Sequence, residues 1–164
     1  MLLMRILLTF SFVCLSVSSL IGRETNPAII PPDSEMAGEG PVRRYGWFTN
    51  LWKGKRTVWA KEIEAKKGAL VFLGDSIIQG WGDDFKGTFG KTMVANRGIS
   101  GDTTRGMLYR MPEDVLALKP SGVVLLMGTN DLEEGAAPEQ IAGNLKLIIK
   151  ALKASDKEMP IILC

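Results

Sequence analysis

The chain has 164 residues, 46% of them hydrophobic, and a formal net charge of +2 from 20 basic and 18 acidic residues scattered along it. This length and composition allow one globular domain, and the small, dispersed charge indicates neither a nucleic-acid partner nor a membrane-surface partner. Cys14 lies in an apolar N-terminal stretch and Cys164 is the last residue, so no internal disulfide is expected. The sequence has no histidine, which is the usual general base for a serine nucleophile.

Residues 1–20 have the layout of a secretory signal peptide. Arg5 supplies one positive charge, and an apolar run with small serine residues near its end extends from Ile6 to Val17. The run is too short and too rich in serine for a membrane span. We therefore expect export to the periplasm or the extracellular space, with no stable membrane span after processing. An uncleaved anchor or a misassigned start codon is the alternative.

Residues 21–45 are rich in proline and glycine and lack apolar periodicity, which predicts a flexible linker. The domain itself is expected from residue 46 onward. Its first element is a predicted helix over Trp47–Lys67, in which Trp52 and Trp59 recur on one face. Aromatic side chains at this spacing favour packing against a sheet over contact with a ligand.

Apolar runs alternate with amphipathic segments along the rest of the chain. This alternation predicts a parallel sheet with right-handed crossovers and helices on both faces, an α/β fold. The expected elements are, in order, a strand over Leu70–Leu73, a strand over Lys91–Ala95, a helix through Leu108 and Met111 that breaks at Pro112 and resumes to Leu118, a strand over Gly122–Met127, a helix over Pro138–Ser155 and a strand from Pro160.

Three polar turns follow the first three predicted strands. Ser76, Gly101 and Asn130 lie in these turns. Because the carboxyl ends of parallel strands meet at one edge of a sheet, where ligands bind, we expect the turns to lie together. A hydroxyl nucleophile, an approachable glycine N–H and an amide donor are the components of an acyl-transfer site with an oxyanion hole. The alternative is three ordinary turns in which Gly101 and Asn130 serve only the backbone geometry.

The same turns resemble the first three sequence blocks of the SGNH (GDSL) hydrolases, most closely those of the catalytic subunits of platelet-activating-factor acetylhydrolase and their bacterial relatives. The resemblance implies a flavodoxin-like three-layer α/β/α sandwich. It also implies that Ser76 is the nucleophile, and that its own N–H, the Gly101 N–H and the Asn130 side chain form the oxyanion hole. The matching blocks are Gly74-Asp75-Ser76, Gly98–Arg105 and Gly128–Asp131.

By this resemblance the chain hydrolyses acyl esters, on acetylated carbohydrates or lipids, without a metal or an organic cofactor. The Gly-x-Ser-x-Gly elbow of α/β-hydrolases does not match, because Ile78 occupies the position of the last glycine. The family's fourth block, Asp-x-x-His, is absent, so residues 46–164 are expected to be the N-terminal part of an SGNH domain, truncated in the fourth strand. Loss of the base alone costs a serine protease roughly a million-fold in turnover, so this fragment is expected to be nearly inactive.

Two alternative functions belong to other classes. The first is a non-catalytic binding domain that uses the oxyanion pocket to hold an acylated sugar or lipid. The second is a phosphate or flavin site, which is less favoured because Asp75 and Asp102 place negative charge where a phosphate would lie, and because the sequence has no P-loop lysine pattern. No oligomeric state is predicted.

Overall fold

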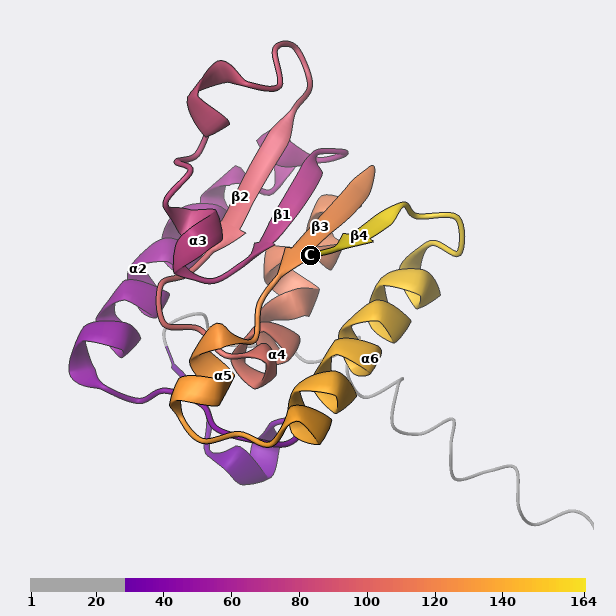
Figure 1. Cartoon of the computed structure of the whole chain (residues 1–164). Helices are drawn as coiled ribbons and strands as arrows, with labels where there is room; N and C mark the ends of the chain where they lie inside the picture. Colours follow the sequence, from indigo (N-terminus) through magenta and orange to yellow (C-terminus); the bar gives the residue numbers. More distant parts are fainter. Residues whose placement is uncertain (1–28) are drawn as a thin grey trace, which may run out of the picture.

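A computed structural model of the chain describes residues 29–164, so the predicted signal peptide lies outside the described residues. A parallel sheet with strand order β2-β1-β3-β4 forms the centre of the molecule, flanked by helices (Figure 1). The expected α/β fold is therefore confirmed. The elements are η1 (Asp33–Glu35), α2 (Gly46–Glu62), η2 (Glu64–Lys66), β1 (Leu70–Gly74), α3 (Ser76–Gln79), η3 (Phe85–Gly87), β2 (Val94–Gly98), α4 (Thr104–Asp114), η4 (Leu116–Leu118), β3 (Gly122–Leu126), α5 (Thr129–Glu133), α6 (Pro138–Ser155) and β4 (Ile161–Leu163).

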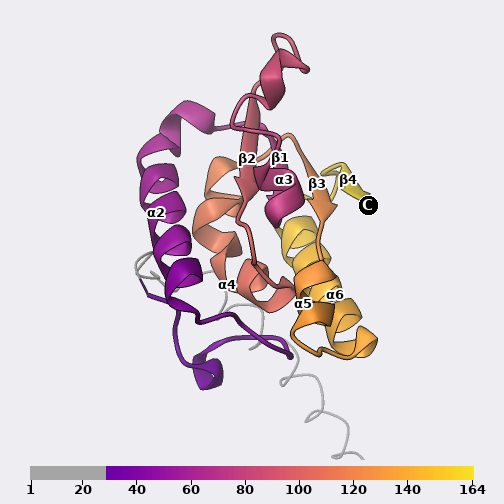
Figure 2. The same ribbon diagram turned by 60° about the vertical axis from the view of Figure 1, so that its left-hand side comes forward.

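The two faces of the sheet are covered by different elements. The long helices α2, α4 and α6 stand in a row (Figure 2), and α4 contacts both of the others. Val71 and Leu73 of β1 point to this side, into a core that includes Met111 of α4 and Leu152 of α6. Phe72 points to the opposite side, as alternation along a strand requires.

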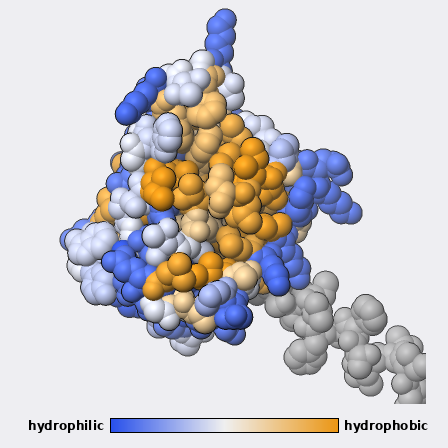
Figure 3. All heavy atoms as spheres, viewed as in Figure 1, coloured by the Kyte–Doolittle hydropathy of each residue, from blue (hydrophilic) through white to orange (hydrophobic). Residues whose placement is uncertain are grey.

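The second face is only partly covered. Phe72 packs there against Phe85 of η3, with the ring centroids 4.3 Å apart, and against Ile78 of α3. Farther along the sheet, Ile162 of β4 is 60% exposed. Hydrophobic side chains accordingly gather on the surface over this part of the sheet (Figure 3). Such an open apolar area is unusual for a monomer surface.

Most elements lie where they are predicted and α6 has the predicted bounds, but α2 ends at Glu62 and not at Lys67. The second strand differs, because β2 spans Val94–Gly98 and not Lys91–Ala95. Polar residues continue this strand because their side chains find hydrogen-bond partners in the interior. Asn96 donates to the Ile78 and Gly82 carbonyls at 2.7 and 2.9 Å, and Arg97 donates to the Asp114 carbonyl at 3.0 Å.

The predicted break at Pro112 does not occur. Pro112 lies inside α4, which continues to Asp114, where the Val115 N–H still bonds to the Met111 carbonyl at 3.0 Å. Proline in a helix interior removes a backbone hydrogen bond, but here it lies in the last turn, directly after the fully buried Arg110 and Met111. Packing of this turn against the core therefore outweighs the local preference.

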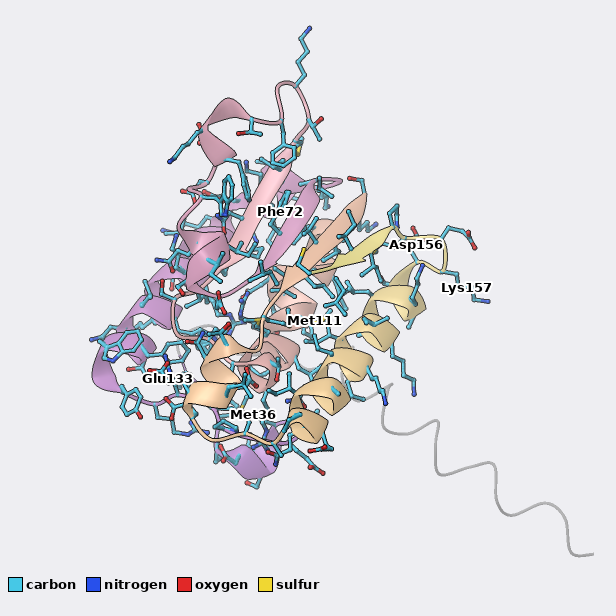
Figure 4. The ribbon with its side chains drawn as sticks, viewed as in Figure 1. Met36, Phe72, Met111, Glu133, Asp156 and Lys157 are labelled. Carbon is cyan, nitrogen blue, oxygen red and sulfur yellow. The ribbon has the colours of Figure 1, made fainter. Side chains whose placement is uncertain are left out.

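The prediction of a flexible linker is wrong for residues 29–45, which pack against the domain. Arg105 of α4 donates to the carbonyls of Gly40, Asp33 and Met36. Met36 is buried and lies at the α5 end of the molecule (Figure 4). Proline and glycine here bend an ordered segment. Three of its carbonyls accept hydrogen bonds from Arg105, and Thr103 and Asn144 donate to two others, long-range contacts that composition does not reveal. Between residues 29 and 164, no helix is long and apolar enough to cross a membrane.

Candidate active site

The three polar turns lie at one edge of the sheet. Strand β1 is central, and the register pairs its last residue, Gly74, with Gly98 of β2 and with Leu126 of β3. The three strands therefore end level with one another, and α3 and α5 begin at this same end (Figures 1 and 2). The chain leaves β1 toward β2 in one direction and later adds β3 on the other side. A crevice at such a switch point is the usual ligand site of an open α/β sheet.

Ser76 is the first residue of α3 and is exposed at this edge. The Asp75 carboxylate caps the helix by accepting a hydrogen bond from the Ile77 N–H at 3.0 Å. Burial raises the pKa of Asp75, and its Oδ2 has no hydrogen-bond partner within the described part of the chain. The cap fixes the turn that presents the Ser76 hydroxyl.

Gly101 has a conformation and surroundings that only glycine fits. Its φ is +87°, and a Cβ at this position would lie 2.6 Å from Cη2 of Trp47 and 3.2 Å from Nη1 of Arg43. Among residues 29–164, neither the Gly101 N–H nor the Ser76 N–H donates a hydrogen bond to another group of the protein. Both N–H groups are therefore available to an acceptor.

Asn130 on α5 is buried, and its amide orientation is fixed from both sides. Its Nδ2 donates to the Asp102 carbonyl at 2.9 Å, and its Oδ1 accepts from Nη1 of Arg43 at 3.2 Å. A carbonyl can only accept and a guanidinium can only donate, so the two contacts allow one orientation of the amide. The second hydrogen on Nδ2 is left for another acceptor.

Asp131, the next residue, ties α5 to the start of α4. Its carboxylate accepts from the Thr104 N–H at 2.9 Å and from the Thr104 hydroxyl at 2.5 Å. Asn144 of α6 donates to the same hydroxyl at 2.9 Å. Burial raises the pKa of Asp131, against the opposing effect of the hydrogen bonds from Thr104. The turn that carries Asn130 is therefore anchored to both neighbouring helices.

Arg110 of α4 connects the loop after β2 to the sheet through hydrogen bonds. Its Nε donates to Oδ2 of Asp102 at 2.7 Å, and its Nη2 donates to the carbonyls of Gly74 and Arg97 at 3.3 and 2.9 Å. These carbonyls belong to the ends of β1 and β2. Burial raises the pKa of Asp102 to about 6, although the Arg110 charge opposes the rise. One buried guanidinium thus joins the Gly101 loop to the strand that precedes Ser76.

Sequence patterns predict Ser76, Gly101 and Asn130 as site residues but give no sign of Arg43 and Arg110. Arg110 lies within an expected helical segment, and Arg43 lies in the predicted linker. The one local signal for Arg43 is its position just before a helix rich in aromatic residues. Within the described residues, no group of three or more His, Cys, Asp or Glu side chains could hold a metal ion.

Known proteins resemble the part of this chain that contains Ser76, Gly101 and Asn130. The model of the GDSL-like lipase/acylhydrolase family matches residues 72–164, more than half of the chain. Human platelet-activating factor acetylhydrolase IB subunit alpha2 is 29% identical over 142 residues, which cover 85% of this chain and 57% of the human protein. Thioesterase 1/protease 1/lysophospholipase L1 of Escherichia coli K12 is 31% identical over 103 residues, 57% of this chain and 50% of that protein.

A solved structure gives the same result for the fold. A GDSL-like lipase from Bacteroides thetaiotaomicron superposes with a TM-score of 0.58 at 32% identity, covering 66% of this chain and 56% of that one. The chain therefore spans about half the length of the relatives named here.

Proposed function

The chain belongs to the GDSL-like lipase/acylhydrolase family, whose members hydrolyse esters, and we propose that it acts on acyl esters with Ser76 as the nucleophile. The observation that carries this proposal is the register of the sheet, which ends β1, β2 and β3 level at one edge. This edge carries an exposed serine hydroxyl, two unengaged N–H groups and a fixed amide donor. Those groups match the needs of acyl transfer.

The proposed reaction has two steps. The Ser76 Oγ attacks the acyl carbonyl carbon, its proton passes to a base, and the carbonyl oxygen becomes a tetrahedral oxyanion. The N–H groups of Ser76 and Gly101 and the free hydrogen on Asn130 Nδ2 stabilise this oxyanion. Protonation of the leaving alkoxide releases the alcohol and leaves an acyl-serine, which water hydrolyses to the acid. None of the 164 residues is a histidine, so the proposal assigns no residue of this chain as the base.

The substrate class that we propose is an acetyl or other short acyl ester of a carbohydrate or a lipid. The likeness to an acetylhydrolase and to a lysophospholipase supports this choice. Residues 1–20 support the further proposal that the protein is exported. Fractionation of cells that express the full chain tests export, which predicts a shortened protein outside the cytoplasm.

An external base makes the proposed nucleophile testable in the chain as it stands. We expect the purified chain, supplied with free imidazole, to hydrolyse p-nitrophenyl acetate faster than imidazole alone, because imidazole takes the part of the general base. Ser76→Ala should abolish the excess rate at every imidazole concentration. Ser121→Ala is the matched control, since Ser121 is exposed at the amino end of β3, and should keep the excess rate. Equal rates for the wild type and Ser76→Ala would overturn the assignment.

A further inference from the structure

We propose that Arg43 is a positioning residue of this site, which orients the Asn130 side chain as an oxyanion donor. The inference rests on the proposed function. Arg43 precedes α2, lies outside the residues 72–164 that the family model matches, and is only 7% exposed. It therefore belongs to a segment that the motifs around Ser76 do not include.

Every nitrogen of the Arg43 guanidinium bonds to α5 or to the residue that follows it. Nη1 donates to Oδ1 of Asn130 at 3.2 Å, Nε donates to Oε1 of Glu134 at 2.6 Å, and Nη2 donates to Oε2 of Glu133. Glu133 lies on α5 (Figure 4), and the spacing of the three acceptors, i, i+3 and i+4, places them on one face of a helix. Arg43 thus forms hydrogen bonds to three side chains along one side of α5 and its C-terminal end.

The hydrogen bond from Arg43 determines which end of the Asn130 amide faces the substrate. Oδ1 is held by a group that can only donate, so Nδ2 must point away from Arg43, toward the Asp102 carbonyl and the open edge. A charged donor on the amide oxygen also polarises the amide, which makes the Nδ2 hydrogens stronger donors. The effect is present before any substrate binds, as oxyanion stabilisation requires.

The same nitrogen also abuts Gly101. Arg43 Nη1 lies 3.2 Å from the place where a Cβ on Gly101 would be, and the side chains of Trp47 and Phe48 also lie next to that place. One guanidinium nitrogen is therefore next to Gly101 in the loop after β2 and to Asn130 on α5, both of which are proposed as oxyanion donors. Burial opposes the charge on Arg43, but the hydrogen bonds with Glu133 and Glu134 raise its pKa above the usual value, so the guanidinium stays charged.

A double-mutant cycle tests whether Arg43 acts through Asn130. We expect Arg43→Met, which keeps the length of the side chain, to lower imidazole-supported kcat by about tenfold to a hundredfold with little change in KM. In the Asn130→Ala background the same change should alter kcat by less than about twofold, because the donor to be oriented is already gone. Equal effects of Arg43→Met in both backgrounds would overturn the inference.

Arg44→Met is the matched control. Arg44 is the adjacent arginine, but it bonds to Asp33 and to the Ile30 and Pro31 carbonyls, away from α5. This variant should keep wild-type kcat. If Arg43→Met does not fold, Arg43→Lys replaces it, since an ammonium keeps the charge but cannot reproduce the planar fork. The same loss of kcat and the same cycle are expected.

A measurement without turnover separates this inference from the proposed function. In ¹H–¹⁵N spectra of the full chain, Arg43→Met should shift the Asn130 side-chain amide pair, whereas Arg44→Met should leave it in place. An unshifted pair would overturn the positioning role even if Ser76-dependent hydrolysis is observed. A shifted pair in a protein without Ser76-dependent hydrolysis would uphold the positioning of Asn130 and reject the proposed function.

Discussion

Asp102 makes two different hydrogen-bonding contacts in the proposed site, one through its backbone and one through its side chain. Its backbone carbonyl accepts from Asn130 Nδ2, and its side chain, which is buried, accepts from Arg110. An ionised carboxylate this deep is stable only when it is paired, and Arg110 provides the pair. Even so, burial raises the pKa of Asp102 from 3.8 to about 6. The residue that supports the oxyanion donors is therefore sensitive to mild acid.

This raised pKa predicts a pH dependence of stability with a definite sign. Between pH 3.8 and about 6 the folded chain binds more protons at Asp102 than the unfolded chain does. The contribution of Asp102 to the free energy of unfolding is therefore fully present below about pH 4 and falls as the pH rises through about 6. In urea unfolding across this interval, we expect the wild type to lose stability relative to Asp102→Asn. A difference that stays constant, or that grows with pH, would contradict the assignment.

The short helix α3 presents Ser76 because two glycines let it approach the sheet. A Cβ on Gly74 would lie 2.4 Å from the Leu126 carbonyl oxygen, and a Cβ on Gly98 would lie 2.3 Å from the Gln79 N and 2.8 Å from the Asp75 oxygen. The obstructing atoms are mostly backbone, which cannot rotate away. Glycine at the ends of β1 and β2 is thus a packing requirement for the turn that carries the proposed nucleophile.

Alanine should destabilise the chain at a glycine that packs against backbone atoms and stabilise it at a helical glycine with free space around it. Gly98→Ala should lower the free energy of unfolding by about 1–3 kcal/mol, because α3 must move away from β2. Gly143→Ala in α6 is the control, since no atom lies within 4 Å of the added methyl group. It should raise the free energy of unfolding by about 0.5–1 kcal/mol, because alanine favours a helix. Urea unfolding of both variants measures the pair, and a neutral Gly98→Ala would contradict the close packing of α3.

At the scale of the whole molecule, the parallel sheet and the edge that carries Ser76 follow from the sequence. Alternating apolar runs and helices specify the topology, and topology alone brings three turns from separate parts of the chain together. The contacts of Arg43 and Arg110 could not be predicted in this way. Their partners lie far along the chain or on backbone carbonyls, and no local pattern records such pairs. The contacts of residues 29–45 could not be predicted for the same reason, because they are made with residues of other elements, such as Arg105 and Asn144.

Identification of the acylated residue tests the central proposal most directly. The chain is incubated with p-nitrophenyl acetate, stopped with acid and digested, and the acetyl group is located by mass spectrometry. Free imidazole is included, because Ser76 needs a base for its acylation and the chain contains no histidine, and the acid quench preserves the acyl-serine. We predict an acetyl group on Ser76 in the wild type and in Ser121→Ala. Acetylation confined to lysine side chains, equal in the wild type and in Ser76→Ala, would show that Ser76 is not the nucleophile.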